Sequence, residues 1–402
     1  MSNNNKSVCY FETPYDIALE FGNDIYNFII EKKLSLLDKN EISVLDIFAG
    51  DGRLGNIIVK IASNHHRKID TTYVEIDAEK LKLIKPYLKS SNLINKNAFE
   101  WDTQIKYDII ISNPPFGILN KKNSKLYGFL WNDVRNSAMN LYGLSILKCL
   151  DLCSDEGIVA IIAPFSWLRG VNSKKFRSEI SKITSSVYIT AFNHRGIFKK
   201  VIQDVGFQIF LKRGGNNFEK SKIYFKYNGF KNQLIRESDL RNVVRSKFIN
   251  VRVGPIVWNR KREFLRDSNE GSILLIYGGN IDHEGNLNLE NLKYSHKQFI
   301  SRSGITESDI IKNPAILIRR TLRGHPGAWK IDSCLIRYDL EFTVENHVII
   351  VELLSDQLDY KNFYFSLIDR IKEYYYYSGT PSISTKVVNN LATQVVNALK
   401  NR

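Results

Sequence analysis

A length of 402 residues exceeds what one typical hydrophobic core supports, so we expect two domains. The composition, with 43% hydrophobic and 25% charged residues, is that of a soluble globular protein, and no apolar run is long enough to span a membrane. Because Met1–Ser7 is polar and has no signal-peptide core, the expected location is the cytoplasm. The net charge of +15 favours a polyanionic partner, most often nucleic acid, although solubility alone also accounts for it.

Residues 1–213 alternate short apolar runs with helical patterns, which predicts a doubly wound α/β sheet in the first domain. The predicted strands are Ser43–Phe48, Thr72–Glu75, Tyr107–Ser112, Gly157–Ala163, Val187–Phe192 and Phe207–Leu211. The predicted helices include Leu54–Ser63, Ala78–Leu88 and Leu141–Leu152. The turn-forming run Arg213–Asn217 predicts a boundary, and residues 216–402 are expected to form a second, mixed α/β domain. The four cysteines have neither metal-ligand nor disulfide spacing, so no metal site is expected.

The segment Val44–Gly55 is predicted to run from a strand through a glycine turn into a helix. Gly50 and Gly52 allow a tight turn and close approach of a ligand, at the strand ends where open α/β sheets bind ligands. The Lys and Ser or Thr of a phosphate-binding loop are missing. A dinucleotide fold and an ordinary strand–helix loop both fit this segment alone.

The next strand ends in acidic residues, at Tyr73–Asp77. A carboxylate at Glu75 can accept hydrogen bonds from both ribose hydroxyls of an adenosine ligand, and Asp77 then begins the next helix as its N-cap. The alternative is that both carboxylates only cap the helix.

The most specific signal is Asn113-Pro114-Pro115-Phe116, which directly follows a buried apolar strand. Two prolines hold the chain extended and leave the Pro114 carbonyl without a local partner. The Asn113 carboxamide oxygen and this carbonyl can then accept from one exocyclic amine, beside the flat face of Phe116. Two acceptors raise the lone-pair density on the amine nitrogen, which can attack an electrophilic methyl group without a metal. A merely rigid turn is the alternative.

These motifs, in this order, resemble the gamma class of N6-adenine DNA methyltransferases, the TaqI-like type, over residues from about Glu12 to Lys212. The resemblance implies a Rossmann-like S-adenosyl-L-methionine-dependent methyltransferase domain followed by a DNA target recognition domain. It implies catalysis by Asn113 to Phe116 on an adenine flipped out of double-stranded DNA and stacked between Phe116 and Phe198. It implies cofactor contacts by Thr13, Asp46, Phe48, Ala49, Gly50, Gly52, Glu75, Asn97 and Asn113. The segments Asn140–Gly143 and Glu156–Pro164 match further motifs of the class.

Two residues depart from the pattern of the class. Asn97 stands where an Asp usually contacts the cofactor adenine, but its side-chain oxygen can still accept one hydrogen bond. The catalytic aromatic residue is Phe116 rather than Tyr, which keeps the stacking face. Cytosine-N4 enzymes usually resemble a Ser-Pro-Pro-Tyr pattern, which is missing, so adenine is the expected target.

In the second domain, a local basic cluster is expected to contact guanine edges and phosphates, with a solvated basic face as the alternative. It consists of Arg319, Arg320, Arg323 and Lys330. We find no PD-x(n)-E-x-K nuclease motif, so a separately encoded restriction endonuclease is a candidate partner. Three rival functions are an RNA adenine methyltransferase, a protein glutamine methyltransferase and a non-enzymatic DNA-binding module.

Overall fold

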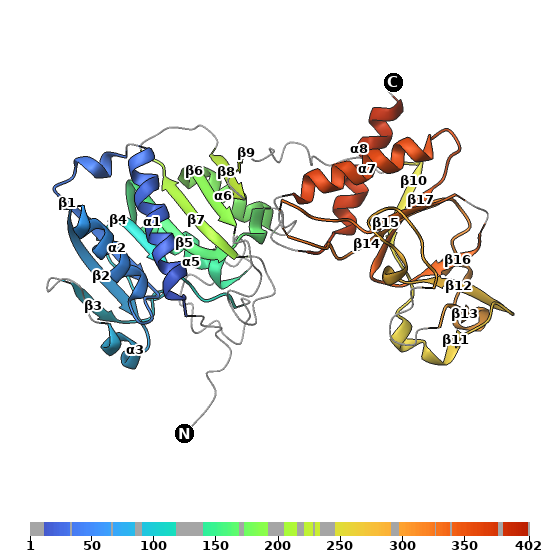
Figure 1. Ribbon diagram of the computed structural model, residues 1–402, viewed down its shortest axis with the longest axis horizontal. Helices are drawn as coiled ribbons and strands as arrows, with labels where there is room; N and C mark the ends of the chain where they lie inside the picture. Colours follow the sequence, from blue (N-terminus) through green and yellow to red (C-terminus); the bar gives the residue numbers. More distant parts are fainter. Residues whose placement is uncertain are drawn as a thin grey trace. The chain divides into compact units, whose positions relative to one another are not determined.

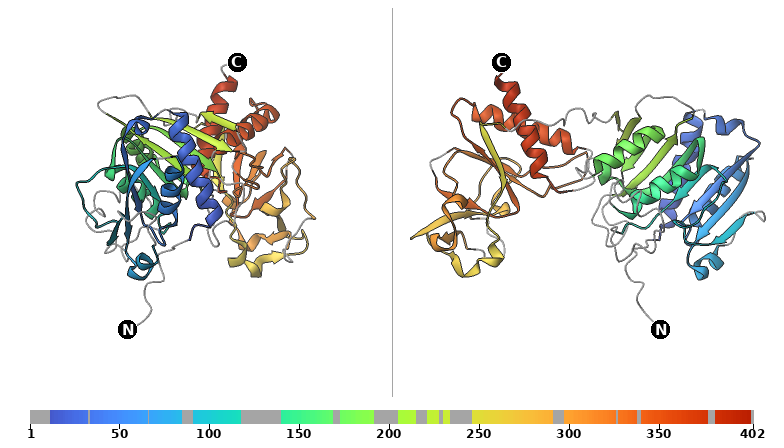
Figure 2. Two further views of the ribbon diagram at one scale, coloured as in Figure 1. Left: turned by 60° about the vertical axis from the view of Figure 1, so that its left-hand side comes forward. Right: turned by 180° about the vertical axis from the view of Figure 1, so that it is seen from behind.

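The computed structural model divides the chain into two units, Met1–Leu234 and Ile235–Arg402, and each is described by itself (Figures 1 and 2). The residues that the structure describes are 12–32, 34–65, 67–84, 91–117, 140–168, 173–191, 205–214, 221–227, 230–233, 246–290, 297–325, 327–337, 340–376 and 381–400. Within these ranges, no helix is long and apolar enough to cross a membrane.

The first unit is built on a nine-stranded sheet with the order β3-β2-β1-β4-β5-β7-β6-β8-β9. The strands are β1 (Glu41–Ile47), β2 (Lys68–Glu75), β3 (Asn92–Asn95), β4 (Tyr107–Ser112), β5 (Cys153–Pro164), β6 (Thr184–Ala191), β7 (Val205–Lys212), β8 (Lys222–Tyr227) and β9 (Phe230–Gln233). Strands β1 to β5 pair in parallel, whereas β7 is antiparallel to both β5 and β6. The carboxyl ends of β1 to β5 therefore share one edge of the sheet.

Helices cover both faces of this sheet. They are α1 (Tyr15–Glu31), α2 (Arg53–Asn64), α3 (Ala78–Leu83), α5 (Leu141–Leu152) and α6 (Lys174–Ile183), with 3-10 turns at Ser35–Asp38 and Ser166–Leu168. Figure 1 shows α1 and α2 in front of the sheet, and the rear view of Figure 2 shows the green helices α5 and α6 on the opposite face. A Cβ atom at Gly22 of α1 would lie 2.7 Å from Ile57 of α2, so the glycine permits this close helix packing. Phe21 stacks on Phe207 of β7 with ring centroids 4.6 Å apart.

The α/β prediction for the first unit is confirmed, and the six predicted strands correspond to β1, β2, β4, β5, β6 and β7. Helix α3 ends at Leu83, and Ile84 after it has an extended backbone with ψ 114°, whereas the predicted helix end at Leu88 lies outside the described residues. Strand β3 escaped prediction because it is a short edge strand with mostly exposed or half-exposed residues. Strands β8 and β9 follow the predicted boundary near Arg213 but extend the first sheet through the β6–β8 pairing.

The second unit contains two four-stranded sheets, with the orders β10-β17-β14-β15 and β11-β13-β12-β16. The strands are β10 (Ile249–Val253), β11 (Leu265–Arg266), β12 (Ser272–Ile276), β13 (Phe299–Ser301), β14 (Ala315–Arg319), β15 (Ser333–Ile336), β16 (Phe342–Val344) and β17 (Val348–Leu353). The helices are α7 (Tyr360–Tyr375) and α8 (Thr385–Lys400), with 3-10 turns at Trp258–Arg260, Arg262–Phe264, Gly278–Asn280, Arg302–Gly304 and Glu307–Asp309.

Strand β14 shows how the layers of the second unit pack. Its residues alternate, so that Ile316 and Ile318 pack with α7 and α8 while Ala315 and Leu317 face β12 and β16. A strand buried on both faces has no polar positions, which explains the continuous apolar run in the sequence. The second unit is therefore a mixed α/β domain, as predicted.

Candidate active site

The glycine turn after β1 adopts a left-handed backbone at three positions. Phe48 has φ 64°, Gly50 has φ 59° and Gly52 has φ 72°. Gly52 is also the N-cap of α2, and a Cβ atom there would lie 2.8 Å from a side-chain carbon of Ile84. The two glycines therefore meet a conformational need, whereas Phe48 holds a backbone that is unfavourable for a bulky side chain.

Asp46 places a buried carboxylate directly beneath this turn. Its Oδ2 accepts a hydrogen bond from the Gly55 backbone amide at 2.8 Å. Its Oδ1 is buried and has no hydrogen-bond partner among the described residues. Burial raises the pKa of Asp46 well above its ordinary value, and the nearby charges of Asp51 and Glu75 add to the rise. Such an oxygen fits a ligand that brings a cationic donor to this position.

Glu75 is fixed at the carboxyl end of β2. Its Oε2 accepts from the Gly50 backbone amide at 2.8 Å, and its Oε1 accepts from the Asp77 amide at 2.9 Å. Asp77 in turn caps α3, because its Oδ1 accepts from the amides of Glu79 and Lys80. The alternative that these carboxylates only cap the helix therefore holds for Asp77 alone. Glu75 instead joins the glycine turn to the end of β2. Each oxygen of Glu75 keeps a lone pair for a ligand hydroxyl.

Apolar side chains border these carboxylates. Ile76 directly follows Glu75 and is 59% exposed, which is unusual for a large aliphatic residue at a strand end. Phe48 and Phe99 lie with ring centroids 4.9 Å apart. The Asn97 oxygen accepts from the Phe99 amide at 3.1 Å, so it stabilises its own turn. Ile76 is not among the predicted site residues, although an isoleucine between two carboxylates at a strand end is a signal that the sequence offers.

Asn113 directly follows β4, and its side chain is oriented by a residue from the start of the chain. Its Nδ2 donates a hydrogen bond to Thr13 Oγ1 at 2.9 Å, and both residues are buried. The Thr13 backbone carbonyl accepts from Arg53 Nη1, and Arg53 Nη2 pairs with Asp51 at 2.7 Å. The segment before α1 is thereby tied to the start of α2. The sequence resemblance predicts a cofactor contact for Thr13, and its contact with Asn113 is an additional finding.

The proline turn is held from the side of α5. Pro114 is buried, and Phe116 is half-buried at the edge of the core beneath α1 and α2. The Gly117 carbonyl accepts from the Leu141 amide at 2.9 Å, which joins the turn to the first residue of α5. Asn140 caps that helix by accepting from its third residue. The turn is therefore anchored at both ends.

The predicted residues of the first unit gather along one edge of the sheet, at the carboxyl ends of β1 to β4. They are Thr13, Asp46, Phe48, Ala49, Gly50, Gly52, Glu75, Asn97, Asn113, Pro114, Pro115 and Phe116. Phe198, predicted to stack on the target base, lies outside the described residues. Across the described ranges, no group of three or more His, Cys, Asp and Glu side chains is arranged to hold a metal ion.

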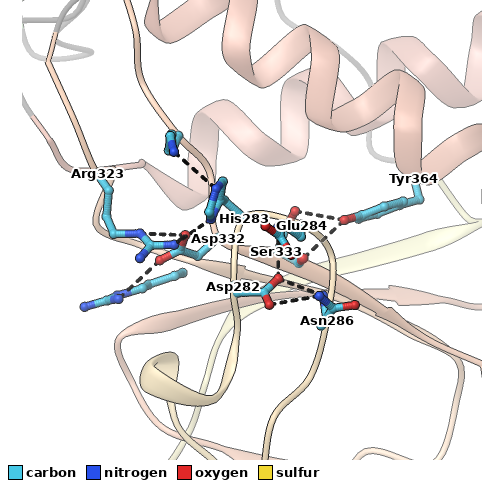
Figure 3. A network of polar contacts seen from close by, with 10 residues as sticks. Asp282, His283, Glu284, Asn286, Arg323, Asp332, Ser333 and Tyr364 are labelled. Carbon is cyan, nitrogen blue, oxygen red and sulfur yellow. Dashed lines mark hydrogen bonds and ion pairs between the residues drawn. The ribbon is translucent and has the colours of Figure 1, made fainter. Parts of the chain in front are cut away.

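Two of the four predicted basic residues of the second unit pair with a buried carboxylate, and Figure 3 shows the contact between Arg323 and Asp332. Arg319 and Arg323 both pair with Asp332, whose side chain is fully buried. Arg320 Nη1 donates to a backbone carbonyl, and Lys330 lies beside a histidine ring. Part of this basic charge is therefore neutralised within the unit.

The strand order of the first unit defines its class. Among the seven strands in the order β3-β2-β1-β4-β5-β7-β6, only β7 is antiparallel, and the predicted ligand residues lie at the carboxyl edge. This arrangement is the Rossmann-like fold of S-adenosylmethionine-dependent methyltransferases, as predicted.

Known proteins support this class. The family model of the Eco57I restriction-modification methylase matches residues 52–198. The Type II methyltransferase M.CvrRI of Paramecium bursaria Chlorella virus XZ-6E is 26% identical over 339 residues, which cover 82% of this chain and 80% of the relative. A release factor glutamine methyltransferase of Buchnera aphidicola subsp. Schizaphis graminum is 30% identical over 89 residues, 22% of this chain and 32% of that protein.

Among solved structures, a nuclease-deletion mutant of the Type ISP restriction-modification enzyme LlaGI, in complex with a DNA substrate mimic, resembles this chain with a TM-score of 0.55. The match is 11% identical and covers 97% of this chain, which spans 55% of that enzyme. The likeness is one of fold and extends over both units.

The chain is therefore similar in sequence to restriction-modification methyltransferases, and the predicted resemblance is confirmed. The fold and these relatives make S-adenosyl-L-methionine its cofactor. The residues present fit this molecule, because the unpaired Asp46 oxygen suits a cationic amino group and Glu75 suits ribose hydroxyls.

Proposed function

We propose that the chain is a site-specific DNA methyltransferase that methylates the N6 amine of an adenine flipped out of the duplex. The observation that carries this proposal is the Asn113–Phe116 turn after β4, with the Asn113 carboxamide held by Thr13. Its position at the carboxyl edge, beside the predicted cofactor residues, suits transfer of a methyl group to an amine.

The chemistry of the proposal depends on two acceptors and one aromatic face. S-adenosyl-L-methionine supplies an electrophilic methyl group, and Asp46 and Glu75 are proposed to hold it. Because Nδ2 of Asn113 is bound to Thr13, the carboxamide oxygen is the group that accepts from the target amine. The Pro114 carbonyl accepts a hydrogen bond from the second N–H of the amine. Together, the Asn113 oxygen and this carbonyl increase the electron density on the amine nitrogen. Phe116 offers one face of the base a stacking partner, and Phe198 is the predicted partner for the other.

The second unit is proposed to recognise the DNA target, with residues 216–402 as the predicted range. Flipping of the adenine costs a few kcal/mol of unstacking, which aromatic stacking partly offsets. A separately encoded restriction endonuclease is the proposed partner in the cell.

One assay tests the proposal against its rivals. The chain is incubated with tritium-labelled cofactor and, in parallel, with duplex DNA, structured RNA and a release-factor-like protein. We expect label in DNA, recovered as N6-methyladenine after digestion to nucleosides. Asn113→Ala should abolish this transfer even at cofactor concentrations that saturate the site, because the main effect is on the chemical step.

Other outcomes would replace the proposal. N4-methylcytosine as the product would contradict the adenine assignment. Label in glutamine would favour protein methylation, the activity named for the shorter Buchnera relative, which matches 22% of this chain. Label in RNA alone would favour an RNA enzyme. More than a tenth of wild-type turnover in Asn113→Ala would contradict the catalytic role of Asn113.

A further inference from the structure

Two cationic side chains of the second unit approach the ring of His283, and Figure 3 shows this ring beside Arg323. The His283 ring lies between two cations, with Nδ1 3.1 Å from Arg323 Nη2 and Nε2 3.2 Å from Lys330 Nζ. All three residues are exposed. We refer to His283, Arg323 and Lys330 as the clamp.

Rigid backbone contacts place Arg323 and Lys330 next to each other. They form an antiparallel β-bridge in which each amide donates to the other's carbonyl, at 3.1 and 2.8 Å. The loop between them begins at Gly324, with φ 95°, where a Cβ atom would lie 2.7 Å from the Ala328 carbonyl oxygen. The two cations are thus held together by the fold and do not meet by side-chain mobility alone.

The hairpin that carries His283 is fixed to the first residue of β15. Asp282 accepts from the Ser333 amide through its backbone carbonyl at 2.9 Å. The Asp282 side chain is occupied within its own hairpin, where it accepts from the amides of Glu284 and Asn286, both at 2.9 Å. It therefore holds the loop and does not pair with Arg323 or Lys330.

The clamp is electrostatically unfavourable as it stands. Like charges placed directly opposite each other on paired strands destabilise the pairing. An imidazole with one N–H can accept at only one nitrogen, whereas both His283 nitrogens face groups that only donate. Among the described residues, Asp332 is the carboxylate that pairs with Arg323, and it is shared with Arg319. An anion bound to the clamp would remove this imbalance.

We propose that the clamp binds a phosphate of the DNA backbone. The inference rests on the proposed function, since it assumes that duplex DNA is the substrate. It concerns phosphate contacts only, which position a protein on DNA without reading the sequence.

The geometry favours a phosphate over a base edge. An arginine that recognises a guanine edge donates two hydrogen bonds from its guanidinium group. In Arg323, Nε and Nη2 already bind Asp332, and Nη2 also contacts His283. Within the described residues only Nη1 is left without a partner, which suits a single phosphate oxygen, and Lys330 supplies a second donor.

The test compares two lysine substitutions that change the net charge equally. Lys330→Gln removes a cation from the clamp. Lys312→Gln is the control, because Lys312 is in the same unit but pairs with Glu307 at 3.1 Å and Glu341 at 3.4 Å. Binding of the full chain, with its cofactor, to a labelled random-sequence duplex is measured by fluorescence anisotropy over a series of salt concentrations.

We expect Lys330→Gln to weaken binding roughly tenfold, as for loss of one charge-assisted contact. The slope of log K against log salt should become shallower by about 0.9, the value for one phosphate contact. Lys312→Gln should leave both quantities unchanged. His283→Ala should weaken binding about fivefold, because the ring that spaces the two cations is removed.

Methyl transfer to DNA, measured on the same variants, distinguishes a failure of the clamp from a failure of the proposed function. If Lys330→Gln behaves like Lys312→Gln while the wild type methylates DNA, the clamp is refuted and the proposed function stands. A loss of binding confined to one sequence would show base reading and also refute the phosphate contact. If the wild type neither binds nor methylates duplex DNA, the proposed function fails and the clamp fails with it.

Discussion

Replacing Thr13 with Val should slow methyl transfer without unfolding the chain. Valine has nearly the same shape as threonine but no hydroxyl, so Asn113 Nδ2 loses the acceptor that lies at 2.9 Å. The Arg53 contact is made to the Thr13 backbone carbonyl and survives the substitution. The perturbation is therefore confined to the orientation of the Asn113 carboxamide and to any direct cofactor contact of the hydroxyl.

The size of the effect follows from burial. Both residues are less than a tenth exposed, so the amide hydrogens of Asn113 cannot turn to bulk water. A buried donor left without a partner costs about 1–3 kcal/mol, which corresponds to roughly fivefold to 150-fold in kcat if the amide turns away from the productive orientation.

The assay is a single-turnover measurement on duplex DNA at saturating cofactor, with cofactor affinity measured separately by calorimetry. Thr13→Ser is the matched control, because it restores the hydroxyl and should restore most of kcat. If Thr13→Val lowers only cofactor affinity and keeps kcat, Thr13 acts on the cofactor alone. If serine fails to rescue kcat, the shape of the side chain matters rather than its hydrogen bond, and the reasoning is refuted.

Three further predictions concern the cofactor site. Glu75→Ala should weaken cofactor binding by about 1.5–3 kcal/mol for each charge-assisted hydrogen bond lost, and an unchanged dissociation constant by calorimetry would place the ribose elsewhere. Asp46→Asn should raise the melting temperature of the cofactor-free chain and reduce the further rise on adding cofactor, because it removes a buried charge that the cofactor is proposed to neutralise. Because the pKa of Asp46 is raised in the folded state, the folded chain binds more protons than the unfolded chain does, and the free energy of unfolding falls as the pH rises from the ordinary 3.8 through the raised value. Asp46→Asn should flatten this part of the pH–stability curve, which denaturant titrations measure. Gly52→Ala should lower stability by about 1 kcal/mol or more, because its φ of 72° and the 2.8 Å contact with Ile84 both exclude a Cβ atom; an unchanged melting temperature would contradict this.

Some features of the site were predictable because the residue type itself imposes the geometry. Glycines at 50 and 52 take the left-handed backbone that the turn requires, and Pro114 and Pro115 make the extended turn after β4. Parallel strands then bring these turns to one edge of the sheet. Local sequence patterns carry this information, so no knowledge of distant contacts was needed.

Other features depend on residues far apart in the chain. The Thr13–Asn113 hydrogen bond joins positions 100 residues apart, and neither local pattern indicates it. Because Arg319 and Arg323 share Asp332, the predicted basic cluster is a partly neutralised network. Strands β8 and β9 likewise belong to the first sheet because β8 pairs with β6, and the composition of residues 222–233 does not reveal this pairing.

A non-glycine residue with positive φ indicates a functional site only when a second observation at the same place supports it. Among the described residues, Phe48 and Glu156 are the non-glycine residues with positive φ. Glu156 lies where β5 bulges against β4, so the irregular pairing of two strands explains its backbone. Phe48 lies in a loop beside the buried, unpaired oxygen of Asp46, and strain of about 1–3 kcal/mol there has no such structural explanation. A bound ligand that pairs with Asp46 and packs against Phe48 would stabilise both residues together, which is why we propose the glycine turn, rather than the β5 bulge, as part of the cofactor site.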